Sequence, residues 1–129
     1  TTTTAAPTTT APPTTTTAAS TTTLPEFPPE NTNLVHGGEV WVVVLAASQD
    51  FNDPVLAQAV SDADDAGYTT GPTDCDVGAA EAVGLPEEEN YYTVSVYFHS
   101  EADAHAAHTA FVARGIEGTV ALVQTFCLD

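Results

Sequence analysis

Basic residues are almost absent from this 129-residue chain. Arg114 is the only one, and it stands against eighteen acidic residues, so that the formal net charge at pH 7 is −17. A surface of this sign repels phosphate backbones and anionic lipid headgroups. The composition therefore argues against nucleic-acid binding and against peripheral attachment to acidic membranes, and leaves cations, neutral sugars or a basic partner as ligands. A solubility adaptation to salt or to an extracellular setting explains the same acidity without any ligand.

Long hydrophobic runs are also missing. No run approaches the roughly 18 apolar residues of a membrane helix, and no apolar segment follows a basic one as in a signal peptide. The chain does not start with Met and begins inside a Thr-rich tract. We therefore expect no transmembrane segment, and either a mature secreted protein or a domain excised from a longer surface protein.

The N-terminal part carries no charge before Glu26. Fourteen of its first 23 residues are Thr, and the others are Ala, Pro and one Ser. Proline holds such a backbone extended and leaves the hydroxyls available to a glycosyltransferase, which is typical of O-glycosylated stalks. We predict an extracellular arm with junction at 1–33 and a compact domain at 34–129. The expected O-glycosylation sites are Thr1, Thr2, Thr3, Thr4, Thr8, Thr9, Thr10, Thr14, Thr15, Thr16, Thr17, Ser20, Thr21, Thr22 and Thr23.

Cysteine occurs only twice, at Cys75 and Cys127, and neither has a metal-like spacing around it. A disulfide is the expected state outside the cell. Closing a loop of this length stabilises a small domain by about 4 kcal/mol in the chain-entropy description. Two separate buried thiols are the alternative.

The hydrophobic pattern predicts alternating strands and helices after a junction at 24–38, with the folded part beginning near Glu39. In chain order we expect a strand buried on both sides at 40–47, a helix from Asp53 and Pro54 to Gly67, a weak edge strand near 68–75, one helical turn within 77–83, a strand at 91–98, a helix from Ser100 to Gly115 and a strand at 119–128. This order is the ferredoxin-like, split βαβ (βαββαβ) arrangement of an α+β fold, an antiparallel sheet with both helices on one face. Its second and fourth strands lie on opposite edges, so Cys75 must occupy a wrapping loop, or the strand order differs.

Two segments carry a resemblance to a known family. They are VWVVVLAASQDFNDPVLAQAVSDADDAGY and YTVSVYFHSEADAHAAHTAFVARGI, and each runs from a strand through a Ser or Phe turn into an Ala-rich helix and a Gly. Together they resemble the two halves of SPOR-like domains, which are wall-associated modules that bind peptidoglycan glycan strands. The resemblance covers most of 39–128. It implies the ferredoxin-like fold, and a glycan-binding function with the arm as a spacer.

The strand at 91–98 alternates cleanly between two faces. Its apolar face should meet the helices and holds Tyr92, Val94, Val96 and Phe98. The other face could lie open to solvent, where its rings and hydroxyls suit sugar stacking or a protein interface. This predicted interaction face consists of Tyr91, Thr93, Ser95 and Tyr97. Ordinary sheet surface is the alternative, because Tyr and Thr both favour strands.

Metal and catalytic motifs are weak. His105 and His108 are spaced to share a metal on a helix, but no second motif supplies further ligands, so a solvated helix end is the favoured interpretation. The acidic run from Asp62 to Gly67 lacks the final Glu of a calcium loop and lies on a predicted helix. We find no nucleophile elbow, no Cys with a partner His and no glycine-rich phosphate cradle. We therefore expect neither an enzyme nor a cofactor.

These observations predict a non-enzymatic, extracellular structural or interaction subunit of a cell-surface assembly, for example a filament. Its partners would be further copies of itself or other cell-surface proteins. Two alternatives stay open. One is a SPOR-like module that binds cell-wall glycan at the end of a stalk, and the other is a cation-responsive surface protein whose acids are neutralised by calcium or salt.

Overall fold

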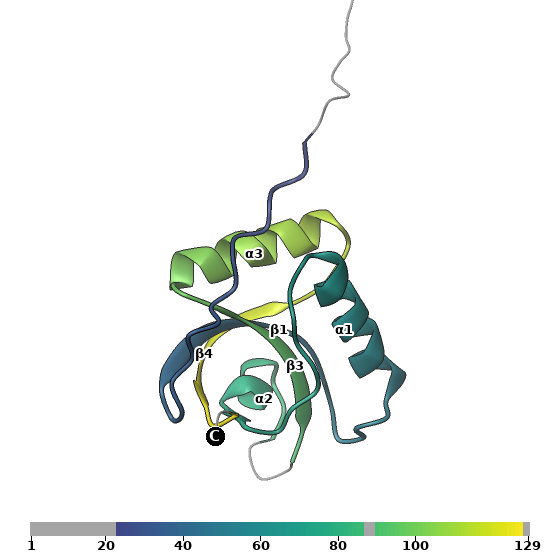
Figure 1. The fold of residues 1–129 in the computed structure, drawn as a ribbon. Coiled ribbons are helices and arrows are strands. Elements are labelled where there is room, and N and C mark those ends of the chain that lie inside the picture. Colours follow the sequence, from purple (N-terminus) through teal and green to yellow (C-terminus); the bar gives the residue numbers. More distant parts are fainter. Residues whose placement is uncertain (1–22, 87–89, 128–129) are drawn as a thin grey trace, which may run out of the picture.

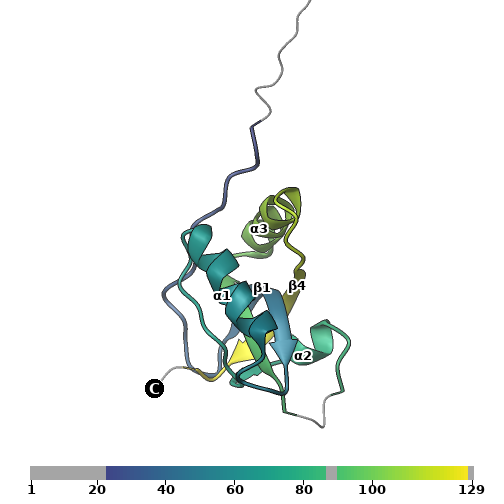
Figure 2. The ribbon, with the colours of Figure 1, turned by 90° about the vertical axis from the view of Figure 1, so that its right-hand side faces the viewer.

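Four strands form one antiparallel sheet in the order β2-β4-β1-β3, and three helices pack on it. The computed structural model describes residues 23–86 and 90–127. The elements are β1 (Glu39–Ser48), α1 (Pro54–Asp65), β2 (Asp76–Val77), α2 (Ala79–Ala82), β3 (Tyr92–Phe98), α3 (Glu101–Ala113) and β4 (Thr119–Thr125). The sheet is curled, with α1 and α3 outside it and α2 within the curve (Figures 1 and 2). This is an α+β fold, broadly compatible with the predicted ferredoxin-like arrangement.

Strand β1 lies at the centre of the sheet, between β3 and β4. Its run of β-branched residues suits a strand that is covered on both faces. Val43 packs with α1 and α3, whereas Val42 and Val44 pack on the other side with Ala79 of α2. All three valines are buried, so the predicted burial on both sides is confirmed.

The two long helices begin and end where the sequence predicts. The Asp53 side chain accepts a hydrogen bond from the Val55 amide at 3.0 Å, and Ser100 accepts one from the Asp103 amide at 3.1 Å, so each caps its helix. Beyond the helix ends, Gly67 and Gly115 adopt φ of 92° and 79°, which favours glycine. The pKa of Asp53 is lowered because two groups donate hydrogen bonds to its carboxylate. The Val55 amide has the larger effect and the Ser48 hydroxyl the smaller one.

The apolar face of β3 meets the helices as predicted. Val94 packs against Leu56 and Ala59 of α1. Val96 and Phe98 pack in the larger cluster that includes Phe111 of α3. Strict alternation along β3 therefore correctly predicts which of its residues face α1 and α3.

The predicted weak edge strand exists, but its expected bounds near 68–75 are wrong. Within that range only Thr73 forms a bridge, to Thr93 of β3, and β2 starts later, at Asp76, where it pairs with β4. Because the sheet curls, the short segment 73–77, which we call the crossing segment, spans from β3 to β4. Cys75 lies in this segment, and β2 neighbours β4 in the sheet, so Cys75 comes beside the end of β4 and the strand order differs from the ferredoxin-like one.

Two other expectations concern the ends of the domain. The last strand was expected over 119–128, but β4 ends at Thr125, and Leu128 lies outside the described residues. At the other end, the folded part begins before Glu39, since Phe27 already packs against the main hydrophobic cluster. Among the described residues, no helix has both the length and the hydrophobicity needed to cross a membrane.

Candidate functional site

The predicted interaction face on β3 does not lie open to solvent. Thr93 is 3% exposed and Ser95 is 1% exposed, while Tyr91 and Tyr97 are half-buried. This is the concave side of the curled sheet, and the chain between α1 and α2 closes over it (Figure 1). The expectation of an open face is therefore wrong for its two central residues, because strand periodicity carries no information on sheet curvature.

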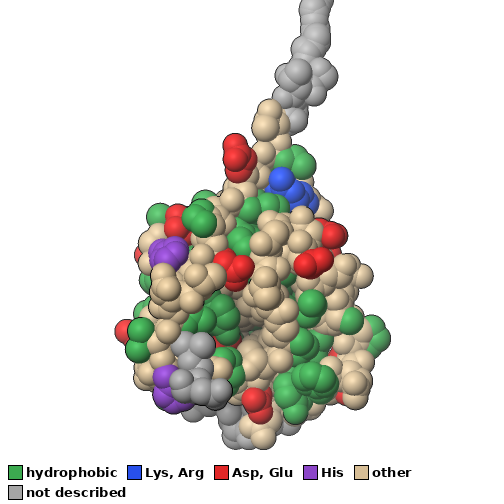
Figure 3. Space-filling model, viewed as in Figure 1, with side chains coloured by type: hydrophobic (Ala, Val, Ile, Leu, Met, Phe, Trp, Pro, Cys, Tyr) green, Lys and Arg blue, Asp and Glu red, His purple; other side chains and the backbone are tan. Residues whose placement is uncertain are grey.

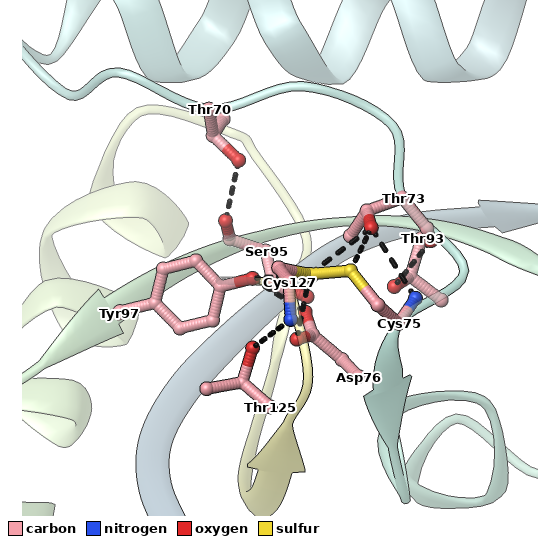
Figure 4. Close-up of a disulfide and its surroundings, with 9 residues drawn as sticks. All are labelled: Thr70, Thr73, Cys75, Asp76, Thr93, Ser95, Tyr97, Thr125 and Cys127. Carbon is pink, nitrogen blue, oxygen red and sulfur yellow. Dashed lines mark hydrogen bonds between the residues drawn. A yellow bond between two sulfur atoms is a disulfide. The ribbon is translucent and has the colours of Figure 1, made fainter. Parts of the chain in front are cut away.

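The concave side instead holds a buried polar cluster (Figure 4). The hydroxyl of Tyr97 donates a hydrogen bond to Oδ2 of Asp76 at 2.6 Å, and the Thr70 hydroxyl donates to the Ser95 carbonyl. Burial, followed by the bond to the Asp76 carboxylate, raises the pKa of Tyr97 well above its usual range. The Ser95 hydroxyl itself is buried and has no hydrogen-bond partner among the described residues. The cluster therefore depends on a small number of polar contacts.

A disulfide joins Cys75 and Cys127 at the rim of this cluster, with 5.1 Å between their Cα atoms. The predicted pairing is confirmed, and the alternative of two separate thiols is excluded. The amide of Phe126 donates to the Cys75 carbonyl at 2.8 Å, and the Thr73 hydroxyl contacts both sulfur atoms. The disulfide thus fastens the crossing segment to the end of β4.

Potential metal ligands come together at one place in the described part of the chain. Cys75, Asp76 and Cys127 have ligand atoms within 4.8 Å of one another. Both sulfur atoms are held in the disulfide, so only the Asp76 carboxylate remains as a ligand. His105 lies 3.5 Å from Glu101 on the exposed side of α3, and His108 is half-buried further along the helix. The structure does not gather these histidines into a three-ligand cluster within the described ranges.

Most of the predicted O-glycosylation sites lie outside the described residues. Thr23 is described, and it is exposed. The segment that follows it runs across α3 before it reaches β1 (Figures 1 and 2). The contacts of this segment with the domain are therefore the described structure that lies nearest to the arm.

Aromatic contacts hold this N-terminal segment to the domain. The ring of Phe27 lies 4.8 Å from that of Phe111 and 5.6 Å from that of Tyr68, measured between centroids. The guanidinium carbon of Arg114 lies 4.4 Å from the centroid of the same Phe27 ring. Phe27 is therefore packed between α3 and the chain that follows α1, with the single cation of the protein over its face.

Hydrogen bonds to the backbone complete the attachment on both sides of Phe27. Arg114 donates from Nη1 to the carbonyls of Pro25 and Ala110, both at 2.9 Å. The hydroxyl of Tyr68 donates to the Pro28 carbonyl at 2.6 Å. In Figure 3 the only basic side chain, in blue, lies where the N-terminal segment meets the domain. The one cation of the chain is thus used within the molecule.

Two further contacts continue the attachment towards β1. The Thr69 amide donates to Glu30 at 3.0 Å, and the Asn31 amide donates to the Tyr97 carbonyl at 2.8 Å. We call residues 25–31 the N-terminal anchor. These residues belong to the expected junction at 24–38, where prolines break any periodic pattern. The available signals were one isolated aromatic residue in that segment and one Arg in an otherwise acidic chain.

A shallow pocket of 330 Å³ lies beside β2 and α2. Its walls carry the carboxylates of Asp74, Asp76 and Glu81, together with Val77 and Tyr91. Asp76 is held by Tyr97, whereas Asp74 and Glu81 are exposed. The pocket is strongly acidic and carries no histidine or nucleophile paired with a base.

Comparisons with protein-family models, with curated proteins and with solved structures find no match to this chain.

Proposed function

We propose that this chain is a non-enzymatic, extracellular structural or interaction subunit of a cell-surface assembly. In this proposal a compact acidic domain is presented on an O-glycosylated, Thr-rich arm. The observation that carries the proposal is the N-terminal anchor, in which Arg114, Phe27 and Tyr68 hold the end of the arm against α3.

A junction between an arm and a domain either leaves the domain free to turn or fixes its direction. A tether that merely keeps a domain near a surface needs no contacts with that domain, since a flexible linker serves as well. A junction that is packed and hydrogen-bonded instead sets the direction in which the domain is presented. The only cation of the chain takes part in this junction, which supports a role in which orientation matters. Assembly into ordered surface structures is such a role.

The ferredoxin-like topology is part of the same proposal. Its support is that β1 lies between β3 and β4, with α1 following β1 and α3 following β3 on one side of the sheet. The departure is β2, which pairs with β4 because of the crossing segment. We assign the fold to this class with a displaced second strand.

The wall-glycan alternative has no comparable support. Its expected sugar-stacking surface included Thr93 and Ser95, which are buried. A SPOR-like function stays a prediction, tested by co-sedimentation with purified peptidoglycan sacculi. Retention that is lost in Tyr91→Ala would favour it, and absence of retention would remove it.

The proposal is tested on material isolated from its source, by intact mass and by negative-stain electron microscopy. Excess mass in hexose steps, localised to the Thr-rich arm, together with regular assemblies is the expected result. An unmodified arm and dispersed monomers would contradict the proposal.

A further inference from the structure

Exposed apolar side chains lie on β2, on β4 and directly after β4. Val77, Leu122 and Phe126 are 57%, 44% and 40% exposed. In the antiparallel pairing Leu122 lies opposite Trp41 of β1, and Val77 of β2 lies opposite Gln124, two residues further along β4.

Strand geometry makes these residues contiguous. Residues directly opposite each other on paired strands share a face, and so do residues two apart along a strand. Trp41, Val77, Leu122 and Gln124 therefore lie on one face of the sheet, towards the edge formed by β2. We call these four residues the β4 strip.

Carboxylates border the β4 strip on two sides. Glu39 lies opposite Gln124 on β1 and is exposed. On the β2 side, Val77 belongs also to the acidic pocket, whose walls carry Asp74 and Glu81. Within the strip, Val77 and Leu122 are thus exposed apolar side chains between negative charges, while Trp41 is half-buried against the main hydrophobic cluster.

This charge pattern disfavours a second copy of the chain as the occupant. The net charge of each copy is −17, and its one cation is engaged in the N-terminal anchor. Two such strips placed face to face would bring carboxylates against carboxylates, with no Lys or Arg within the strip, and like charges in contact oppose association. Charge complementarity calls for Lys or Arg side chains on the partner.

We infer that the β4 strip binds a basic protein segment in which apolar side chains alternate with Lys or Arg. The apolar side chains of that segment would cover Val77 and Leu122, and its cations would meet Glu39, Asp74 and Glu81. This inference rests on the proposed interaction role and names the chemistry of the partner.

The test is an NMR titration of the ¹⁵N-labelled full chain at about 150 mM salt. The probe is the synthetic peptide KVKLKVK, and the control peptide KSKSKSK has the same charge without the apolar residues. We expect KVKLKVK to shift the amides of Val77, Leu122 and Gln124, and to bind at least tenfold more tightly than KSKSKSK. Equal binding of the two peptides, or shifts spread over the whole acidic surface, would overturn the inference.

Matched variants show whether the peptide binds at the β4 strip or at any exposed apolar side chain. Val77→Ser with Leu122→Ser should weaken KVKLKVK binding at least tenfold. The control pair Val55→Ser with Val112→Ser removes two equally exposed valines on α1 and α3, at 47% and 53%, and should leave binding unchanged. Because all four side chains are exposed, thermal melts should show that both pairs fold.

A second readout is sedimentation of the full chain without peptide. A monomer is expected, and a dimer that is lost in Val77→Ser with Leu122→Ser would overturn the inference in favour of a second copy. Failure of the peptide to bind leaves the glycan mass and the microscopy unaffected, so it is distinguishable from failure of the proposed function.

Discussion

The two faces of the sheet are built from different chemistry. On the face covered by α1 and α3, the buried side chains are nearly all apolar, as with Val96, Phe98 and Phe111. On the concave face, the valines of β1 share the interior with Asp76 and Thr125, which are both buried. The first face gains stability from burial in proportion to apolar area. The second also depends on the hydrogen bonds of its buried polar groups, such as the one from Tyr97 to Asp76.

This difference shows what the disulfide does in the fold. The concave face is closed by a crossing segment with one bridge to β3 and a two-residue strand on β4. Such short pairings have little stability of their own. The covalent link at Cys75 and Cys127 holds the closure where packing and backbone pairing are weakest.

The largest expected effect is on the helix-covered face. Phe111→Ala should lower the free energy of unfolding by about 5 kcal/mol, the upper end for such a substitution, because its ring also contacts the N-terminal anchor. Urea unfolding measures this value. The neighbouring, exposed Val112→Ala is the control and should change stability by less than about 0.5 kcal/mol. A small effect of Phe111→Ala would mean that this face is not the main source of stability.

Removal of the disulfide should have the next largest effect. Cys75→Ser with Cys127→Ser should cost about 4 kcal/mol, because the unfolded chain regains the freedom of a loop that spans 52 positions. Calorimetry measures the loss in the double variant and, separately, in the wild type under reducing conditions, each against the oxidised wild type. If both retain wild-type stability, the concave face closes without its covalent link and the comparison between the faces fails.

Tyr97→Phe should have an intermediate effect, confined to the concave face. It leaves the buried carboxylate of Asp76 without its shortest hydrogen bond, at a cost of about 1–3 kcal/mol. Tyr92→Phe, on the opposite face of the same strand, is the matched control. Equal losses in the two variants would show that the bond to Asp76 contributes nothing specific.

The ionisation of Tyr97 should have the smallest effect on the free energy of unfolding at neutral pH. This effect should grow as the pH becomes alkaline. Its pKa is raised in the folded state, so the native protein keeps this proton at a pH where the unfolded chain loses it. Stability is therefore fully present below about pH 10, the ordinary tyrosine pKa, and falls as the pH rises above that value. Unfolding curves across this range should show a shallower decline in Tyr97→Phe. Tyr68, whose pKa burial also raises, should account for part of the remaining decline, and identical slopes in the two proteins would contradict this account.

The sequence was a good guide wherever neighbouring residues decide the structure. The apolar run of β1, the alternation of β3 and the caps Asp53 and Ser100 all act over a few positions, and the elements they predict are confirmed. The disulfide was predictable because two cysteines allow only one pairing.

What the sequence could not show depends on distant contacts. The curl of the sheet buries Thr93 and Ser95 through a segment twenty residues earlier in the chain. The N-terminal anchor joins Pro28 to Tyr68 and Pro25 to Arg114, pairs separated by 40 and 89 positions. No local pattern encodes either arrangement, so the concave face was expected to be open and the contacts of the anchor within the junction at 24–38 were not predicted.

In the proposed function the arm meets the domain through a rigid junction, and ¹⁵N relaxation of the full chain measures that rigidity. We predict backbone order parameters of about 0.85 for the amides of Phe27, Glu30 and Asn31, equal to those of α3, with a fall in Arg114→Ala. Values below about 0.6 for these amides in the wild type would show a flexible linker and contradict the account.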